Sequence, residues 1–153
     1  MLQIINQLKD NYIFMASALS WATAQVLKTI IDFLITKDFT AERLVGAGGM
    51  PSAHSAFVSS LAVSTGRFCG LDSPEFALAF GLACVVIYDA MGVRRAAGEQ
   101  AKMINMLADE LLKNHNKDGT VVNQLKELLG HTPLEVLAGC VLGITIAMVF
   151  KGI

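Results

Sequence analysis

Two histidines and one glutamate carry the chemistry that this sequence could perform. His131 is followed four residues later by Glu135, and His54 stands in the short segment PSAH at 51–54. A neutral imidazole can attack phosphorus to form a phosphohistidine, and a second, protonated imidazole can give its proton to the leaving alkoxide. A carboxylate beside the attacking ring would orient it and stabilise its charged form. These residues therefore predict a nucleophile at His131, an orienting partner at Glu135 and an acid at His54.

Glu135 has a second interpretation. The stretch TPLE at 132–135 fits a capping box with proline in the first helical position, in which the glutamate side chain bonds the start of its own helix. Both roles stay open from the sequence, and one carboxylate could serve both. His115 stands in a polar stretch and is interpreted as a solvated surface residue.

The residues just before His54 have the features of a phosphate cradle. Gly49 ends a glycine pair, and Pro51 suits the first turn of a helix because its missing N–H would be unpaired there anyway. A helix start offers N–H groups and a partial positive charge, and Ser52 adds a hydroxyl donor. Cations from other segments could complete the cradle, namely Lys28, Arg43 and Arg94 or Arg95. Each residue also has a plain structural explanation, as a turn, a helix cap or a cation whose long side chain reaches the membrane surface.

The elements that must position these residues are hydrophobic. Of 153 residues, 54% are hydrophobic and only 16% are charged, which is too apolar for an ordinary soluble domain of this length. The apolar segments run from about Ile13 to Ile35, Ala53 to Leu71, Phe76 to Val93 and Leu134 to Phe150. Roughly 20 apolar residues span a bilayer, and the three shorter segments taken singly could instead be buried helices of a soluble core. Together they predict an all-α integral membrane helical bundle of about four spans, with residues 1–153 forming a single domain.

Between the third and fourth apolar segments the sequence changes character. From Arg94 to His115, apolar residues recur at helical spacing while charged residues fill most other positions. This pattern predicts an amphipathic surface helix, and the stretch from Val121 to Gly130 predicts a second, short helix. The amphipathic excursion thus covers about residues 94–130. Its plainer interpretation is a solvated connection between two spans.

The direction of the chain predicts that the reactive residues meet. In four consecutive spans, the end of the first, the start of the second, the end of the third and the start of the fourth lie on one side. The histidines and their candidate partners fall at these four places, together with Asp89 near the end of the third segment. Polar residues gathered at one end of a membrane bundle indicate a site rather than four unrelated helix ends.

Several other functions are disfavoured. The net charge of -1 and the absence of a basic run with interleaved aromatics argue against nucleic acid as a partner. No spacing of His, Cys or Asp resembles a metal site, so neither a metal nor another cofactor is expected. The three cysteines, Cys69, Cys84 and Cys140, are odd in number and far apart, and we interpret them as buried thiols.

Three motifs carry a resemblance to a known family. They are GGMPSAHS at 48–55, YDAMGVRRAAG at 88–98 and GHTPLEV at 130–136. In this order they resemble the divergent branch of the type 2 phosphatidic acid phosphatase and vanadium haloperoxidase superfamily, over nearly the whole chain. The resemblance implies metal-independent hydrolysis of a phosphomonoester or pyrophosphate of a membrane lipid, in two steps through a phosphohistidine. Peroxidase chemistry, known in soluble relatives, is not expected of a small membrane chain.

The better-known members have a lysine and Arg-Pro, then Pro-Ser-Gly-His, then Ser-Arg, five residues, His, three residues and Asp. Matched residue by residue, the resemblance implies that Ser52 binds phosphate and His54 protonates the leaving group. His131 is implied to be the nucleophile, with Glu135 in the place of the aspartate.

The cations depart further from that pattern. Arg94 or Arg95 would replace the arginine of the third motif, although about 35 residues separate it from the nucleophilic histidine. Lys28 is the candidate for the first lysine, and Arg43 is followed by leucine rather than proline. Asp89 has no counterpart and is an auxiliary candidate.

The distribution of positive charge predicts the orientation in the membrane, and small residues in the last apolar segment predict a close helix contact. Nine of the Lys and Arg residues fall on the side of the three motifs and three on the other side, which predicts that this side faces the cytoplasm in a bacterial cytoplasmic membrane. Gly139, Gly143 and Ala147 are spaced four apart and could form a close helix contact within the chain or between copies of a homo-oligomer.

Alternatives to a lipid phosphatase remain. The split third motif and the glutamate in the place of aspartate motivate a non-catalytic membrane module that binds phosphorylated lipid or scaffolds partners. A small transporter is a third class, but four short spans offer little room for a pathway unless the protein oligomerises. For the phosphatase, the expected substrate is a lipid phosphate such as phosphatidic acid, phosphatidylglycerol phosphate or polyprenyl diphosphate, and the sequence does not choose among them.

Overall fold

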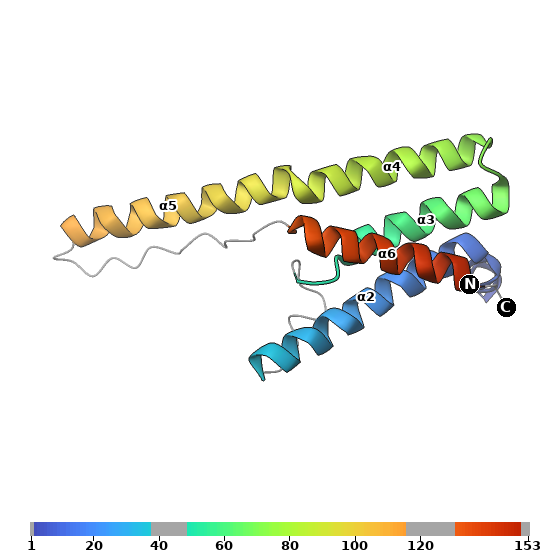
Figure 1. The fold of residues 1–153 in the computed structure, drawn as a ribbon, viewed down its shortest axis with the longest axis horizontal. Helices are drawn as coiled ribbons and strands as arrows, with labels where there is room; N and C mark the ends of the chain where they lie inside the picture. The colour runs from blue at the N-terminus through green and yellow to red at the C-terminus, as the bar shows by residue number, and fades with distance from the viewer. Residues whose placement is uncertain (1, 38–48, 116–130, 151–153) are drawn as a thin grey trace.

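The computed structural model describes residues 2–37, 49–115 and 131–150, and in these ranges every regular element is an α-helix (Figure 1). The helices are α1 (Leu2–Asp10), α2 (Tyr12–Thr36), α3 (Ala53–Cys69), α4 (Pro74–Met91), α5 (Val93–His115) and α6 (Pro133–Val149). The four predicted apolar segments correspond to α2, α3, α4 and α6, and the predicted amphipathic helix corresponds to α5. The all-α class is confirmed. The short helix predicted near residues 121–130 lies outside the described ranges.

The four helices of the bundle each begin at a residue whose side chain caps them. Asn11 accepts a backbone N–H of the first turn of α2 at 3.0 Å, and Ser73 does the same for α4 at 3.1 Å. Ser52 caps α3 and Thr132 caps α6. These bonds satisfy N–H groups that have no partner within the helix, so local sequence signals place the helix starts.

α3 lies at the centre of the bundle and packs against α2, α4 and α6 (Figure 1). At one end of the bundle, Gly49 lies against the stem of Lys28 from α2, and the N–H of Ser52 donates to the carbonyl of Glu135 from α6 at 3.0 Å. At the other end, the hydroxyl of Tyr12 at the start of α2 lies 3.0 Å from the carbonyl of Ala147 near the end of α6. The predicted gathering of helix ends is therefore confirmed.

The interior of the bundle is built from small residues. Its apolar part is mostly alanine, and the largest fully buried side chains are Ser17, Ser20, Ser52, Ser55, Ser60 and Ser64. Large apolar side chains face outward instead, as at Leu34, Leu78 and Leu137, which are 69%, 76% and 60% exposed. This distribution suits a bilayer, because lipid surrounds the large apolar side chains while small residues let the helices approach closely.

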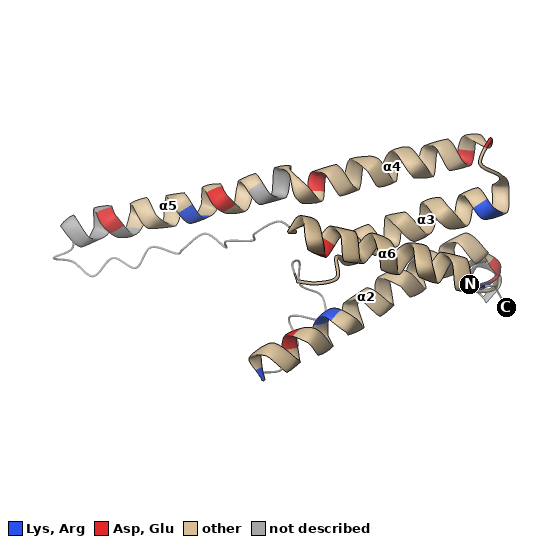
Figure 2. Cartoon of the chain, viewed as in Figure 1, with Lys and Arg blue, Asp and Glu red and all other residues tan. Residues whose placement is uncertain are grey.

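Helix length and composition agree with a membrane setting. Among the described residues, two helices are long and apolar enough to cross a membrane, Tyr12–Thr36 and the stretch Pro74–Ala108. α6 is apolar but has 17 residues, and α3 also has 17. Charged residues lie near helix ends and along α5, while the middle parts of α3, α4 and α6 carry none (Figure 2). The fold is that of an all-α membrane protein in which α3 and α6 are the two short helices of the bundle.

Two glycines bring α6 close to α3. A Cβ at Gly139 would collide with the carbonyl oxygen of Ser52, and a Cβ at Gly143 would collide with that of Ala56. Ala147, four residues further on, is fully buried. The stripe of small residues on α6 therefore makes its close contact inside the chain.

α4 and α5 form one nearly continuous rod (Figure 1). The N–H of Gly92 donates to the carbonyl of Tyr88 at 2.9 Å, and the N–H of Ala96 donates to the carbonyl of Gly92 at 3.0 Å. These two bonds join the helices at Gly92, whose φ of -103° and ψ of -80° lie outside the α-helical region, and α5 extends past the other helices of the bundle (Figure 1).

Two features differ from the sequence-based expectations. Cys69 and Cys84 are exposed and Cys140 is half-buried, so the prediction of three buried thiols is wrong. Cys84 and Cys140 lie within α4 and α6, where apolar neighbours place a residue toward lipid and the interior takes alanine, glycine and serine. Cys69 is the last residue of α3 and lies at the end of the bundle. The nine-residue helix α1 at the start of the chain was not expected either.

Candidate functional site

His131 and Glu135 form a hydrogen-bonded pair at the start of α6. Nδ1 of His131 lies 2.9 Å from Oε2 of Glu135, one helical turn further on. The ring is buried, with 7% of the residue exposed. A hydrogen on Nδ1 is donated to the carboxylate, which leaves the lone pair of Nε2 for chemistry. The pair therefore has the geometry of an oriented nucleophile.

The same carboxylate caps α6. Oε2 of Glu135 accepts the N–H of Thr132 at 3.2 Å, and the N–H of Glu135 donates to Oγ1 of Thr132 at 3.3 Å, which completes a capping box. The two interpretations of Glu135 are thus compatible, because one oxygen serves both contacts. The cap holds the carboxylate in place, and the carboxylate holds the ring of His131.

Ser52 joins the start of α3 to this turn of α6. Its N–H donates to the carbonyl of Glu135 at 3.0 Å. Its side chain is fully buried, and its Oγ accepts the N–H of Ser55 at 3.4 Å and the hydroxyl of Ser55 at 3.0 Å. Glu135 therefore contacts His131 through its side chain and the Ser52 motif through its main chain. Two motifs that are distant in the sequence meet at this one residue.

Lys28 is buried beneath the loop that precedes α3. It is 7% exposed, and a Cβ added at Gly49 would lie 3.0 Å from its Cγ and 3.1 Å from its Cδ. Gly49 also has a φ of 83°, a conformation that residues with side chains rarely adopt. Glycine is needed here for the turn and for the close approach of the lysine stem. Lys28 is thereby held at the same end of the bundle as Ser52 and His131.

His54 and Asp89 stand at this end of their helices. His54 is the second residue of α3 and is exposed. Asp89 is half-buried in the last turn of α4. Three of the predicted site residues, Lys28, Ser52 and His131, are buried, whereas His54 lies at the surface of the same end.

The candidate arginines are only partly described. Arg43 lies outside the described residues, and of Arg94 and Arg95 the structure describes the backbone alone, in the first turn of α5. Because both belong to α5, their register is defined relative to the residues that follow them in this helix.

The two neighbouring arginines have different positions in that register. Arg94 lies four residues before Gly98 of α5, which is buried. Arg95 lies four residues before Glu99, which is exposed. The position of Arg94 is therefore on the same side of α5 as a buried residue, and that of Arg95 is on the same side as an exposed one.

The opposite end of the bundle has a polar cluster that sequence reasoning missed. Nη1 of Arg67 donates to the hydroxyl of Tyr12 at 2.8 Å and also to the carbonyl of Ala147. The hydroxyl of Tyr12 lies 2.9 Å from the carbonyl of Phe150, and its ring stacks on Phe68 and Phe150 with centroids 6.2 and 5.7 Å apart. These contacts satisfy the last carbonyls of α6, which have no partner within the helix. The preference of tyrosine for membrane interfaces was the available signal, but it does not name the partners.

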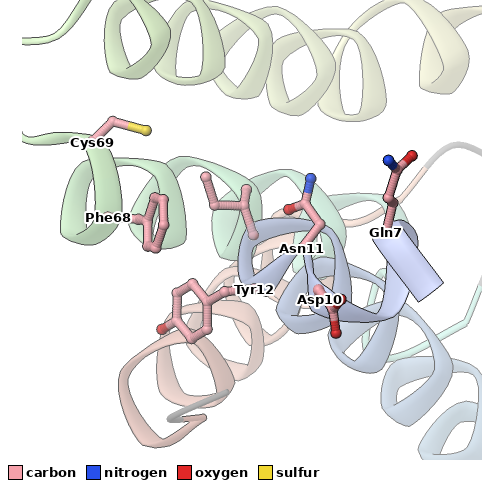
Figure 3. Close-up of a pocket in the computed structure, with 7 residues that line it drawn as sticks. Gln7, Asp10, Asn11, Tyr12, Phe68 and Cys69 are labelled. Carbon is pink, nitrogen blue, oxygen red and sulfur yellow. The ribbon is translucent and has the colours of Figure 1, made fainter. Parts of the chain in front are cut away.

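A cavity of about 380 Å³ lies beside this second cluster and not beside the histidines (Figure 3). Its walls come from the end of α1, the start of α2 and the end of α3, through Gln7, Asp10, Asn11, Tyr12, Ile13, Phe68 and Cys69. Among the described residues, no three His, Cys, Asp or Glu side chains lie together as ligands for a metal ion.

Comparisons with known proteins agree with the sequence motifs. The family described as "Divergent PAP2 family" matches residues 9–146. A protein of Bacillus subtilis (strain 168), described as "Uncharacterized membrane protein YuiD", is 38% identical over 151 residues, which cover 94% of this chain and 96% of that protein. No solved structure matches the chain. The resemblance found in the three motifs is confirmed, and this membrane protein belongs to the Divergent PAP2 family.

Proposed function

We propose that this protein is a lipid phosphatase that works through a phosphohistidine at His131. The observation that carries the proposal is the double contact of Glu135, whose carboxylate bonds Nδ1 of His131 while its carbonyl bonds the N–H of Ser52. One residue thereby holds the nucleophile beside the start of α3, where N–H groups and a partial positive charge favour an anion. Membership of the Divergent PAP2 family supports the same class of chemistry.

In the first step, the lone pair of Nε2 of His131 attacks the phosphorus atom of the substrate. A nitrogen–phosphorus bond forms, and the bond between phosphorus and the lipid oxygen breaks. His54, in its protonated form, gives its proton to that oxygen as the lipid leaves. Glu135 stabilises the positive charge that develops on the ring of His131.

In the second step, water replaces the histidine. His54, now neutral, accepts a proton from the water whose oxygen attacks phosphorus, the nitrogen–phosphorus bond breaks, and inorganic phosphate leaves. The donors assigned to the equatorial phosphate oxygens are Lys28, Ser52, Arg94 and the N–H groups after Gly49, with Arg43 as a further candidate. Asp89 stays an auxiliary candidate that does not donate to the phosphate. Fixed donors of this kind stabilise charge in both transition states without reorganising.

Arg94, rather than Arg95, is assigned to phosphate. The support is its register in α5, because Gly98, four residues further on, is buried. The side that carries Arg95 and Glu99 is exposed, which suits a solvated cation.

The proposed substrate is a lipid that carries a phosphomonoester or a diphosphate. Next to His131, the first turns of α6 expose Leu134 and Leu137, which are 63% and 60% exposed. Such side chains can lie against a hydrocarbon tail while the phosphate reaches the polar helix starts. Phosphatidic acid, phosphatidylglycerol phosphate and polyprenyl diphosphate all fit this description.

The end of the bundle that carries Ser52, His54 and His131, called the motif end below, is proposed to face the cytoplasm of a bacterial cell. The basis is the excess of Lys and Arg on that side. Cys69 is exposed at the end of α3, which is the opposite end of the bundle. A maleimide that does not cross membranes is therefore expected to label Cys69 from outside intact cells and to leave Cys69→Ser unlabelled at this position. Labelling of Cys69 only after permeabilisation would reverse the orientation.

The activity is tested with full-length protein in lipid nanodiscs and the three candidate lipids. We expect release of inorganic phosphate without added metal and inhibition by orthovanadate, a phosphate analogue. His131→Ala should lower turnover by more than about 1000-fold because it removes the nucleophile. His115→Ala is the matched control and should keep full turnover.

Two results would overturn the proposal: no turnover of any of the three lipids by the wild type, or full activity in His131→Ala. Lipid binding that persists in His54→Ala and His131→Ala, without phosphate release by the wild type, would favour the non-catalytic lipid-binding module instead.

A further inference from the structure

We infer that Ser55 is a positioning residue for the phosphate cradle, because its hydroxyl fixes the hydroxyl of Ser52 as a donor toward the bound anion. The inference rests on the proposed function, in which Ser52 binds phosphate. Ser55 directly follows His54 in the chain, and the sequence motifs assign it no role.

The hydroxyl of Ser52 has a limited capacity for hydrogen bonds. A hydroxyl has one hydrogen to donate and two lone pairs that accept. Oγ of Ser52 accepts the N–H of Ser55 at 3.4 Å and the hydroxyl of Ser55 at 3.0 Å. With the hydroxyl of Ser55 assigned as the donor of the second bond, both lone pairs are occupied and the hydrogen of Ser52 points away from Ser55.

The second of these bonds is the informative one. The bond from the backbone N–H is the ordinary helix cap and would be made with almost any residue at position 55. It leaves one lone pair of Ser52 open, and the hydroxyl could then accept from other donors or turn. The hydroxyl of Ser55 occupies that lone pair and leaves Ser52 only the role of a donor.

Burial makes this arrangement rigid. Ser52 and Ser55 are both 0% exposed, so bulk water does not compete for the lone pair. A Cβ added at Gly139 would lie 3.0 Å from Cβ of Ser55, so α6 closes over the pair. The main chain of Ser52 is bonded to the carbonyl of Glu135. A buried donor that is already oriented can bind an anion without reorganising.

The experiment uses full-length protein in nanodiscs with orthovanadate as the probe and calorimetry as the readout. Ser55→Ala removes the hydroxyl, and Ser55→Cys keeps nearly the same volume with only a weak donor. Each variant is expected to weaken vanadate binding by roughly 5- to 10-fold and to raise KM for the lipid more than it lowers kcat. A threonine is not used, because its extra methyl group would meet α6 at Gly139.

The matched control is Ser60→Ala. Ser60 is fully buried on the same helix, and its Oγ has no hydrogen-bond partner in the described part of the chain. Vanadate affinity is expected to be unchanged in this variant, which separates the loss of a particular hydrogen bond from the loss of any buried hydroxyl on α3.

A double-variant cycle decides whether Ser55 acts through Ser52. If it does, Ser55→Ala weakens vanadate binding in the wild type but has no further effect once Ser52 is alanine. Losses that add in Ser52→Ala/Ser55→Ala would overturn the inference, because they would indicate independent packing roles. If Ser55→Ala fails to fold, Ser55→Cys is combined with Ser52→Ala in the same cycle.

Failure of this inference can be told from failure of the proposed function. Weak vanadate binding in Ser52→Ala, together with wild-type affinity in both Ser55 variants, would reject the role of Ser55 and leave the phosphatase in place. A wild-type protein that neither binds vanadate nor releases phosphate would reject the phosphatase itself.

Discussion

The two ends of the bundle hold polar residues in different ways. At the end of α6, Arg67 and Tyr12 direct their hydrogen bonds to backbone carbonyls, and the tyrosine ring is packed between two phenylalanines. At the start of α6, Glu135 satisfies the helix start and also orients His131, whose Nε2 then remains for chemistry. The difference between the two ends is that one has only structural hydrogen bonds, whereas the other also has a reactive atom that the helix cap does not use. A polar cluster of the second kind indicates chemistry.

Moving α6 relative to α3 should damage the motif end most. In Gly139→Ala the new Cβ meets the carbonyl of Ser52, which as backbone cannot move aside easily. We expect the free energy of unfolding to fall by about 1–3 kcal/mol. Turnover per folded molecule should fall by about 100-fold or more, since His131 is displaced from the helix start of Ser52. Chemical denaturation and turnover of the same preparation measure both effects.

The control for this change is Gly81→Ala on α4, where an added Cβ would meet no atom within 4 Å. This variant should keep its turnover and gain up to about 1 kcal/mol, because alanine favours a helix over glycine. If Gly139→Ala and Gly81→Ala had the same turnover per folded molecule, the contact between α6 and α3 would not position the site.

The next largest effect at the motif end is expected from one of two adjacent arginines, Arg94, and not from the other, Arg95. Arg94→Ala should lower kcat/KM by about 100-fold, because a charged donor to the phosphate oxygens is lost in the transition state. Arg95→Ala should stay within about twofold of the wild type, since its register is shared with exposed residues. Steady-state kinetics on one lipid phosphate measure both. The reverse ranking of the two variants would contradict the register argument.

The smallest effect on activity is expected at the opposite end. Arg67→Ala removes hydrogen bonds to the hydroxyl of Tyr12 and the carbonyl of Ala147, and Tyr12→Phe removes the hydroxyl itself. Each variant should lose about 1–3 kcal/mol of unfolding free energy while turnover per folded molecule changes by less than about twofold. Turnover that falls without any loss of stability would contradict the purely structural role of this end.

Much of the fold could be predicted from local signals. The apolar segments, with the caps at Ser52 and Thr132, predict the bundle helices, and their alternating direction places both histidines at one end. The double role of Glu135 was also within reach, because both of its interpretations depend on residues within one helical turn.

What the sequence could not predict depends on contacts between distant residues. The hydroxyl of Tyr12 meets the carbonyls of Ala147 and Phe150, which are 135 and 138 positions away. No local pattern names such partners. The cysteines were placed wrongly because an apolar neighbourhood indicates burial in water-soluble proteins, whereas in this bundle it indicates the lipid side. The role proposed for Ser55 depends on the contact of its hydroxyl with that of Ser52, which no sequence pattern indicates.

The most direct test of the central claim is to trap the phosphoenzyme. His54→Ala should slow the second step, in which His54 accepts a proton from water. The first step is less affected with a diphosphate lipid, whose phosphate leaving group needs the proton of His54 less than an alkoxide does. A diphosphate lipid labelled in its terminal phosphate should therefore leave label on the protein. We predict an acid-labile, alkali-stable phosphate that mass spectrometry locates on His131 and that is absent from His54→Ala/His131→Ala. Turnover by the wild type with label on another residue, or with no labelled protein in His54→Ala, would contradict this account.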